Sequence, residues 1–383
     1  MYSNNRKISI RQIGRLLILD LFGAGSLLLP GLLAKTAGAD GVFCIVAATI
    51  VAIGYLWILG KVLQQQQEEY CSWIRQTVGN IAGDIILIFY LFFFLLLAAF
   101  LLYQLTGLVR VWLLPGGSYG WIQFLILILA AYGTLRGIEG RARIYEILFW
   151  FLGAPLLLML FLAARDVNVD YWTPVMYAVP EDFGKGVLLA FVFFLPAFFI
   201  PFQKYYCSKP QRLTGCARKS VIMAGLLNIV VFLILIGNFQ VKTTAILERP
   251  VITLMSMVKL PGGFFARMDA FMTAIWFFSL FALMNTGIFY ASHILKEMFH
   301  EKKTQYGLLA VMILTFSATQ WFWEYPGAVK VYEKYVLYIG LWGILGIPLL
   351  VGIIAWIRGN RDRKTGNRNV GLRKKWRVSK GEE

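Results

Sequence analysis

The sequence has too few charged residues for a water-soluble protein. Asp, Glu, Lys and Arg make up 15% of its 383 residues, whereas typical soluble domains contain about 25%. So few charges cannot cover the surface of a soluble fold, and the same composition excludes a disordered chain, a coiled coil and a disulfide scaffold. Because 59% of the residues are hydrophobic, we predict a protein whose solvent is lipid.

Groups that carry chemistry are also scarce. The four cysteines fit neither a zinc-ligand spacing nor a thioredoxin-type pair, and the two histidines, His293 and His300, lack the spacing of metal ligands. The sequence has no glycine-rich nucleotide-binding loop, which excludes a pump driven by ATP. We therefore predict a protein that is not an enzyme and that uses no catalytic residue, metal or cofactor. The function that remains is ligand binding, with or without transport.

What the sequence has in abundance is long apolar runs. A helix needs about 20 apolar residues to cross roughly 30 Å of hydrocarbon, and hydrophobicity here is continuous within each run, which favours helices over barrel strands. We predict an all-α polytopic membrane protein with ten transmembrane helices in one permease-like domain, residues 1–357. The expected spans are 10–34, 41–63, 84–109, 119–136, 142–164, 185–206, 216–239, 267–295, 306–323 and 332–357.

The basic residues indicate how these spans are oriented. With the N-terminus in the cytoplasm, 27 of the 37 Lys and Arg residues fall on the cytoplasmic side and 10 fall outside, as the positive-inside rule requires. We therefore predict that both termini are cytoplasmic. Ten of the cytoplasmic residues lie in the tail, 358–383, which we expect to bind anionic lipid headgroups. Nucleic acid is not an expected partner.

Ten spans divide into two sets of five, and the odd number makes the second set run inverted relative to the first. Transporters built from such inverted repeats have interrupted helices at matching places in both halves. The first span contains Gly-Ala-Gly-Ser at 23–26 and then Pro30, and the sixth contains Pro196 and Pro201. We predict that both spans are discontinuous at these positions. Glycine and proline that serve only helix packing or a kink are the alternative.

The predicted breaks indicate what kind of ligand could bind. Free N–H groups near Gly25 and Ser26 would attract a carboxylate, and freed carbonyl groups would accept from an ammonium. An α-amino acid presents both groups. Asp20 lies just before the first break, where a charge is costly unless it is paired or hydrated. We predict an ion or proton site at Asp20, or alternatively a carboxylate hydrogen-bonded to a neighbouring helix.

Other polar residues inside the spans could line the same pocket. Thr286 and Tyr290 lie four residues apart and share a face of the eighth span, and Tyr103 lies in the third. Hydrogen bonds between helices, worth about 0.6 kcal/mol each, explain them equally well. The predicted ligand-binding residues are Gly23, Gly25, Ser26, Tyr103, Pro196, Thr286 and Tyr290.

Several motifs together resemble a known family. The chain starts with Ile8-Ser9-x-Arg11-Gln12, then Gly23, Leu28-x-Pro30 and Ala37-Gly38-x-Asp40-Gly41; later come Arg249-Pro250, Pro261-Gly262, Arg267-x-Asp269 and Trp276. In order and spacing, and with ten spans, this pattern resembles the spore-germination permeases, the B subunits of GerA-type nutrient germinant receptors. The resemblance extends from residue 8 to about residue 357.

This resemblance implies an amino acid–polyamine–organocation superfamily fold in the spore inner membrane. It implies a sensor that binds a small-molecule germinant, commonly an amino acid, between the first, third, sixth and eighth helices. Such a sensor acts with an A-type subunit and a lipoprotein C-type subunit. An ion-coupled secondary amino-acid transporter and a purely structural membrane subunit are the alternatives.

Overall fold

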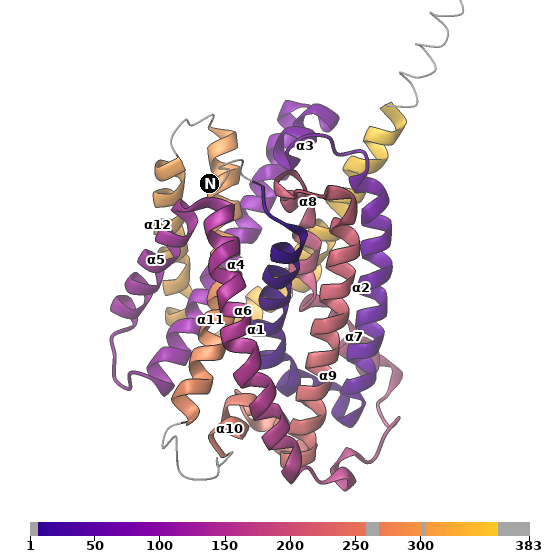
Figure 1. Cartoon of the computed structure of the whole chain (residues 1–383), viewed down its shortest axis with the longest axis vertical. Coiled ribbons are helices and arrows are strands. Elements are labelled where there is room, and N and C mark those ends of the chain that lie inside the picture. The colour runs from indigo at the N-terminus through magenta and orange to yellow at the C-terminus, as the bar shows by residue number, and fades with distance from the viewer. Residues whose placement is uncertain (1–6, 258–267, 300–303, 359–383) are drawn as a thin grey trace, which may run out of the picture.

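The computed structural model describes residues 7–257, 268–299 and 304–358, and these form a bundle of α-helices (Figure 1). The helices are α1 Ile10–Ala37, α2 Gly41–Leu63, α3 Tyr70–Val78, α4 Asn80–Trp112, α5 Tyr119–Leu135, α6 Gly137–Ala163, α7 Pro180–Val192, α8 Ile200–Gln203, α9 Leu213–Ile246, α10 Pro250–Met257, α11 Met268–Met298, α12 Thr304–Glu324 and α13 Ala328–Tyr335. α13 continues through a π-helical turn, Val336–Gly340, into a helix that ends at Arg358. Within the described ranges, β-structure is limited to one bridge between Ile8 and Cys207.

The long helices correspond to the ten expected spans. Seven described stretches are long and apolar enough to cross a membrane, and the bent pair α7–α8 makes eight. One stretch, Ile10–Leu63, has 54 residues, which would be about 80 Å of helix at 1.5 Å per residue. The chain reverses near Gly38, whose φ is 61°, so that α1 and α2 run in opposite directions (Figure 1). Separating these two helices and adding the apolar 17-residue α5 gives ten.

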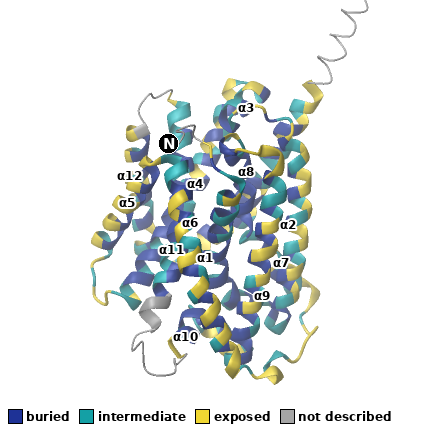
Figure 2. Cartoon of the chain, in the orientation of Figure 1, coloured by how far each residue is buried: buried dark blue, intermediate teal, exposed yellow. Residues whose placement is uncertain are grey.

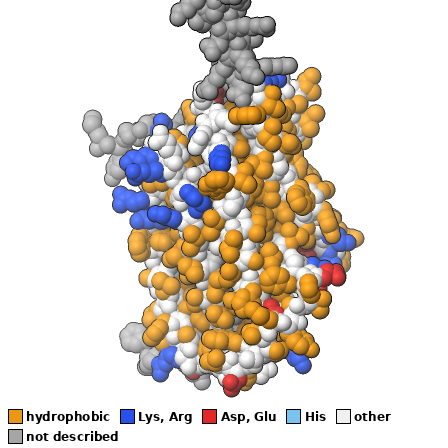
Figure 3. All heavy atoms as spheres, turned by 90° about the vertical axis from the view of Figure 1, so that its right-hand side faces the viewer, with side chains coloured by type: hydrophobic (Ala, Val, Ile, Leu, Met, Phe, Trp, Pro, Cys, Tyr) orange, Lys and Arg blue, Asp and Glu red, His pale blue; other side chains and the backbone are white. Residues whose placement is uncertain are grey.

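The outer surface is that of a membrane protein. Large apolar side chains, among them Ile50, Trp57 and Trp150, are exposed on the outer helices. Figure 3 shows a largely apolar middle, with a group of Lys and Arg side chains toward the upper end. So wide an apolar surface marks an interaction with lipid, and the chain is an integral membrane protein.

The two ends of the described chain lie at the same end of the bundle (Figure 1). This arrangement fits the expected placement of both termini on one side of the membrane, and the identity of that side stays a prediction. The basic tail beyond Arg358, for which lipid binding is predicted, lies outside the described residues, as does His300.

Helices α1, α9 and α11 occupy the centre of the bundle. α1 packs mainly against α9 and α11, and α11 packs in turn against α4. Figure 2 shows buried residues along these central helices and exposed residues on the outer faces of peripheral ones. Polar groups placed on the central helices are therefore shielded from lipid, where they can be paired or can line a cavity.

The first span is not broken, and the sequence prediction is wrong there. α1 is one continuous helix of 28 residues that includes 23–26 and Pro30. A Cβ atom at Gly23 would lie 2.8 Å from the main-chain carbon of Ser279 in α11, and one at Gly25 would lie 3.0 Å from the side chain of Asn228 in α9. These glycines allow close helix packing, and the N–H groups near Gly25 stay within the helix instead of facing a ligand.

The sixth span is broken, as predicted. α7 ends at Val192, α8 begins at Ile200, and the two parts of the span are bent by 47°. Pro196 and Pro201 lack the N–H groups that a continuous helix would donate to the carbonyls four residues earlier. The segment between α7 and α8 winds as a 3₁₀-helix over Leu195–Phe199, so that irregular backbone lies inside the bundle.

Candidate functional site

A cavity of about 170 Å³ lies beside the break in the sixth span. It is enclosed by α1, α4, the α7–α8 segment, α11 and α13, so four of its walls come from the first, third, sixth and eighth spans. Most lining side chains are apolar. The lining residues are Asp20, Ala24, Leu28, Leu32, Phe93, Leu97, Phe100, Leu101, Leu189, Val192, Phe193, Leu195, Pro196, Phe199, Leu283, Tyr332, Glu333, Val336 and Leu337.

Asp20 is the fully buried charge in the wall of this cavity, and its side chain is 1% exposed. Its Oδ2 accepts a hydrogen bond from the hydroxyl of Thr286 in α11 at 2.9 Å. Its Oδ1 is buried and has no hydrogen-bond partner. Leaving a buried polar atom without a partner costs about 1–3 kcal/mol, and more for a charged group. This oxygen can therefore accept a proton, a cation or the ammonium of a ligand.

Arg141 is a candidate site residue that the sequence did not predict. Counted from the sequence among the cytoplasmic basic residues, it lies instead in α6 with its side chain buried. Its Nη2 donates to the hydroxyl oxygen of Thr286 at 2.6 Å, so Thr286 bridges the guanidinium and the carboxylate of Asp20. The guanidinium carbon also lies 4.8 Å from the ring centre of Phe289, a favourable cation–π distance. The two buried charges compensate each other, which lowers the cost of burying either one.

The position of Arg141 explains why it was missed. The expected fifth span begins at residue 142, and α6 begins at Gly137. An arginine one residue outside an expected span is typical of a loop under the positive-inside rule. The side chain of Arg141 is buried in the bundle because α6 packs beside α1 and α11.

Two of the predicted site residues, Asp20 and Pro196, line the cavity. Thr286 does not line it but donates a hydrogen bond to Asp20. Ser26 lies on another part of α1, where its hydroxyl accepts a hydrogen bond from Trp276 Nε1 at 2.9 Å and donates to the carbonyl of Phe22. Gly23 and Gly25 face α11 and α9, as described above. The structure therefore brings the predicted residues of α1 to a helix-packing surface, with the exception of Asp20.

The two predicted tyrosines lie in aromatic clusters. Tyr290 packs against Phe94 of α4 and Phe202 of α8, with ring centres 5.2 and 5.1 Å away. Tyr103 packs against Phe322 and Trp323 of α12. Neither is among the lining residues of the cavity, and ligand binding by these residues stays a prediction.

A ten-span helical bundle with one broken span and a small internal cavity defines a permease-like membrane protein. Two solved transporters have a similar fold. A Na⁺-coupled sialic acid symporter in a substrate-bound outward-open state matches with a TM-score of 0.64 and 12% identity, over 89% of this chain and 78% of the other. MHP1, a nucleobase-cation-symport-1 family transporter in a closed conformation with bromovinylhydantoin bound, matches with a TM-score of 0.66 and 12% identity, over 91% and 77%.

Within this class, the chain belongs to the spore germination protein family, whose profile matches residues 7–324. Spore germination protein YndE of Bacillus subtilis (strain 168) is 25% identical over 334 residues, which cover 82% of this chain and 88% of the relative. Spore germination protein B2 of the same strain is 24% identical over 368 residues, which cover 94% and 98%. The family assignment made from sequence motifs is confirmed. The family and the two similar structures are permeases or transporters, which fits the prediction that this chain is not an enzyme.

Proposed function

We propose that this chain is the nutrient-sensing membrane subunit of a germinant receptor in the spore inner membrane, with both termini in the cytoplasm. It binds a small amino acid in the cavity beside the broken span and passes the conformational change to an A-type and a lipoprotein C-type subunit. The observation that supports this role is Asp20, a buried carboxylate with one oxygen that has no hydrogen-bond partner, in the wall of a largely apolar cavity within a spore germination protein.

The chemistry of the cavity favours a primary ammonium with a short apolar body. Asp20 provides a carboxylate oxygen that can accept from an ammonium, and most of the other lining side chains are apolar. The volume of about 170 Å³ is close to the roughly 150 Å³ of an engineered protein cavity that binds benzene, so a small ligand fits.

Signalling would follow from the break in the sixth span. A ligand shifts a conformational equilibrium only when it binds one state more tightly than the other. A ligand held between α1 and the α7–α8 segment would favour one angle between the two parts of the sixth span. Residues of that span reach the end of the bundle that carries both described chain ends (Figure 1), where partner subunits could detect the change.

The test is germination of spores in which this chain supplies the nutrient response, scanned over amino acids and their deaminated acids. Asp20→Asn keeps the hydrogen bond with Thr286 but removes the charge. It should raise the half-maximal amino-acid concentration by at least about tenfold, the equivalent of 1.4 kcal/mol. Asp182→Asn in the first turn of α7, where the Asp182 side chain is 47% exposed, is the matched control and should respond as the wild type. An unchanged response of Asp20→Asn, or equal activity of deaminated acids, would contradict the proposal.

An ion-coupled secondary amino-acid transporter is the second candidate. The similar fold of cation-coupled transporters and the buried carboxylate of Asp20 favour it. Uptake of a labelled amino acid by the chain alone in liposomes, measured with and without a sodium or proton gradient, separates the two functions. Uptake that follows the gradient would support transport, whereas binding without uptake would support sensing.

A further inference from the structure

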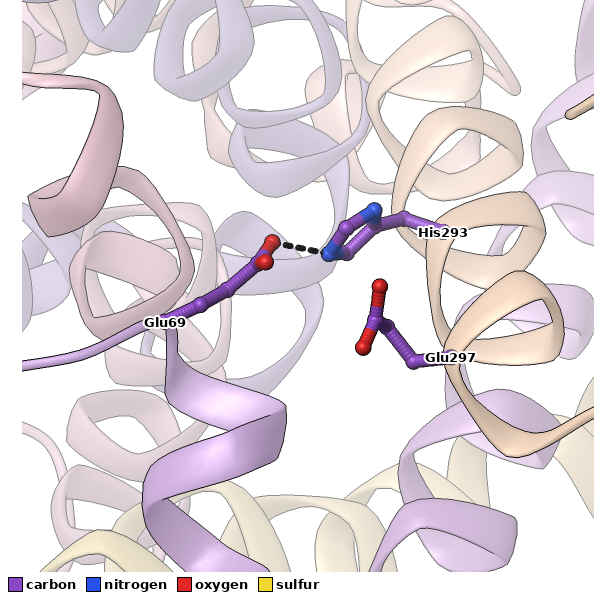
Figure 4. A group of neighbouring side chains, drawn as sticks. All are labelled: Glu69, His293 and Glu297. Atoms are coloured by element: carbon purple, nitrogen blue, oxygen red, sulfur yellow. Dashed lines mark ion pairs between the residues drawn. The ribbon is translucent and has the colours of Figure 1, made fainter. Parts of the chain in front are cut away.

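Three side chains that can bind a metal ion converge at the end of the bundle that holds both described chain ends. Glu69 directly precedes α3, and His293 and Glu297 lie on α11. Figure 4 shows these side chains directed toward one another. One ligand atom from each lies within 4.8 Å of the other two. None of the three lines the cavity at Asp20, so this is a separate cluster.

The spacing on α11 suits a shared ion. His293 and Glu297 are four residues apart and therefore lie on the same helix face, the arrangement by which helical zinc motifs bring two side chains to one ion. Ligands at about 2.0–2.1 Å from a tetrahedral zinc lie roughly 3.3 Å apart. The observed separations of up to 4.8 Å need only small side-chain rotations to reach that geometry.

Glu69 approaches from the opposite side and is held in place. The hydroxyl of Tyr206 donates to its Oε1 at 2.7 Å, and the same oxygen contacts Nε2 of His293. The hydrogen bond from Tyr206 and the contact with His293 fix the position of this carboxylate.

The surroundings leave room for the remaining ligands of an ion. The cluster lines a hollow of about 700 Å³, through which water can reach the open coordination positions. Lys7, Arg143 and Lys296 line the same hollow and compete for the carboxylates. An ammonium or guanidinium group interacts with these side chains only through charge and hydrogen bonds, whereas a divalent transition metal can bind the imidazole and both carboxylates directly as ligands.

We propose that Glu69, His293 and Glu297 form a binding site for a divalent transition-metal ion, with zinc as its probe. The ion joins the segment before α3 to α11, and Tyr206 connects it to the end of the broken sixth span. A bound ion therefore fixes one end of that span relative to α11.

The experiment is a calorimetric titration of the purified full chain in detergent, freed of metal by a chelator, with zinc chloride. We expect about one zinc per chain. His293→Gln and Glu297→Gln should each weaken binding by at least about tenfold, because even the loss of groups that only support metal ligands costs 10–100-fold. Magnesium in excess should not displace zinc, since it prefers an all-oxygen octahedral site.

Two controls distinguish this site from adventitious binding and from the nutrient pocket. His300→Gln changes the other histidine of the chain and should keep full zinc affinity, and Asp20→Asn should do the same. All variants are compared as monodisperse protein, and Glu69→Gln provides a third ligand variant if one of the others does not fold. The absence of saturable zinc binding by the wild type would overturn the proposal. Equal affinity of His293→Gln and wild type, or equal losses in His293→Gln and His300→Gln, would do the same.

Discussion

The first span contains Gly23, Gly25 and Pro30, and the sixth contains Pro196 and Pro201, yet α1 is one helix of 28 residues whereas the sixth span is bent by 47°. The difference lies in what each residue removes. A glycine removes a side chain and allows a neighbouring helix to approach, while a proline removes a backbone donor. One missing donor is tolerated in α1, whereas two missing donors close together leave the sixth span with a 3₁₀ segment between its parts.

This contrast also separates packing from binding. α1 uses its glycines and Ser26 against α9 and α11, and it contributes Asp20 to the cavity from another part of its surface. The sixth span contributes its irregular segment to the cavity wall. A substitution at Gly23, which faces main chain, should therefore change stability, and substitutions at the break should change the response to ligand.

The largest expected effect comes from Gly23→Val. Its Cβ would lie 2.8 Å from the main chain of Ser279, and main chain cannot rotate away as a side chain can. Overpacking of this kind costs about 3 kcal/mol at the upper end of the usual range. The free energy of unfolding should fall by that amount in a titration with a denaturing detergent.

Gly54→Val in α2 is the matched control, because a Cβ at Gly54 meets nothing within 4 Å. Its effect should stay within about 0.5 kcal/mol, as for most surface changes. Equal stabilities of the two variants would show that α1 and α11 are not as closely packed as the structure indicates.

Ser26→Ala should have the next largest effect. Without the hydroxyl, the buried Nε1 of Trp276 has no acceptor, and an unsatisfied buried donor costs about 1–3 kcal/mol. Ser292→Ala is the control, because the Ser292 hydroxyl is also buried and bonds only a carbonyl of its own helix, that of Ile288 at 2.7 Å. The same unfolding titration should show a loss for Ser26→Ala that exceeds the loss for Ser292→Ala by at least about 1 kcal/mol.

Pro196→Ala tests the broken span itself. The new N–H can bond the carbonyl of Val192 and let α7 continue past Val192 to Leu195, which moves Phe193 and Leu195 of the cavity wall. We expect the half-maximal germinant concentration to rise by about tenfold, the equivalent of 1.4 kcal/mol. Pro30→Ala makes the same change in the continuous helix and should leave the germination response unaltered. A response that changes equally in both variants would remove the functional difference between the two spans.

The sequence alone predicts much of the architecture, because apolar runs report directly on helices in lipid. Ten spans, the break at Pro196 and the role of Asp20 as a buried charge all follow from local patterns. The continuity of α1 could not be predicted, since glycine at 23 and 25 permits both an opened backbone and a close helix contact. Arg141 could not be predicted as a partner either, because its approach to Thr286 depends on how α6 packs against α11.

The smallest expected effect comes from Gly25→Ala, two residues from Gly23 on the same helix. Its Cβ would lie 3.0 Å from Nδ2 of Asn228, an atom at the end of a side chain that can rotate away. The clash is further offset because alanine favours a helix over glycine by about 1 kcal/mol, so the net change in the free energy of unfolding should stay within roughly 0.5 kcal/mol. A loss as large as that of Gly23→Val would mean that Asn228 is held rigidly by α9, and the contrast between main-chain and side-chain neighbours would no longer explain which glycines of α1 are essential.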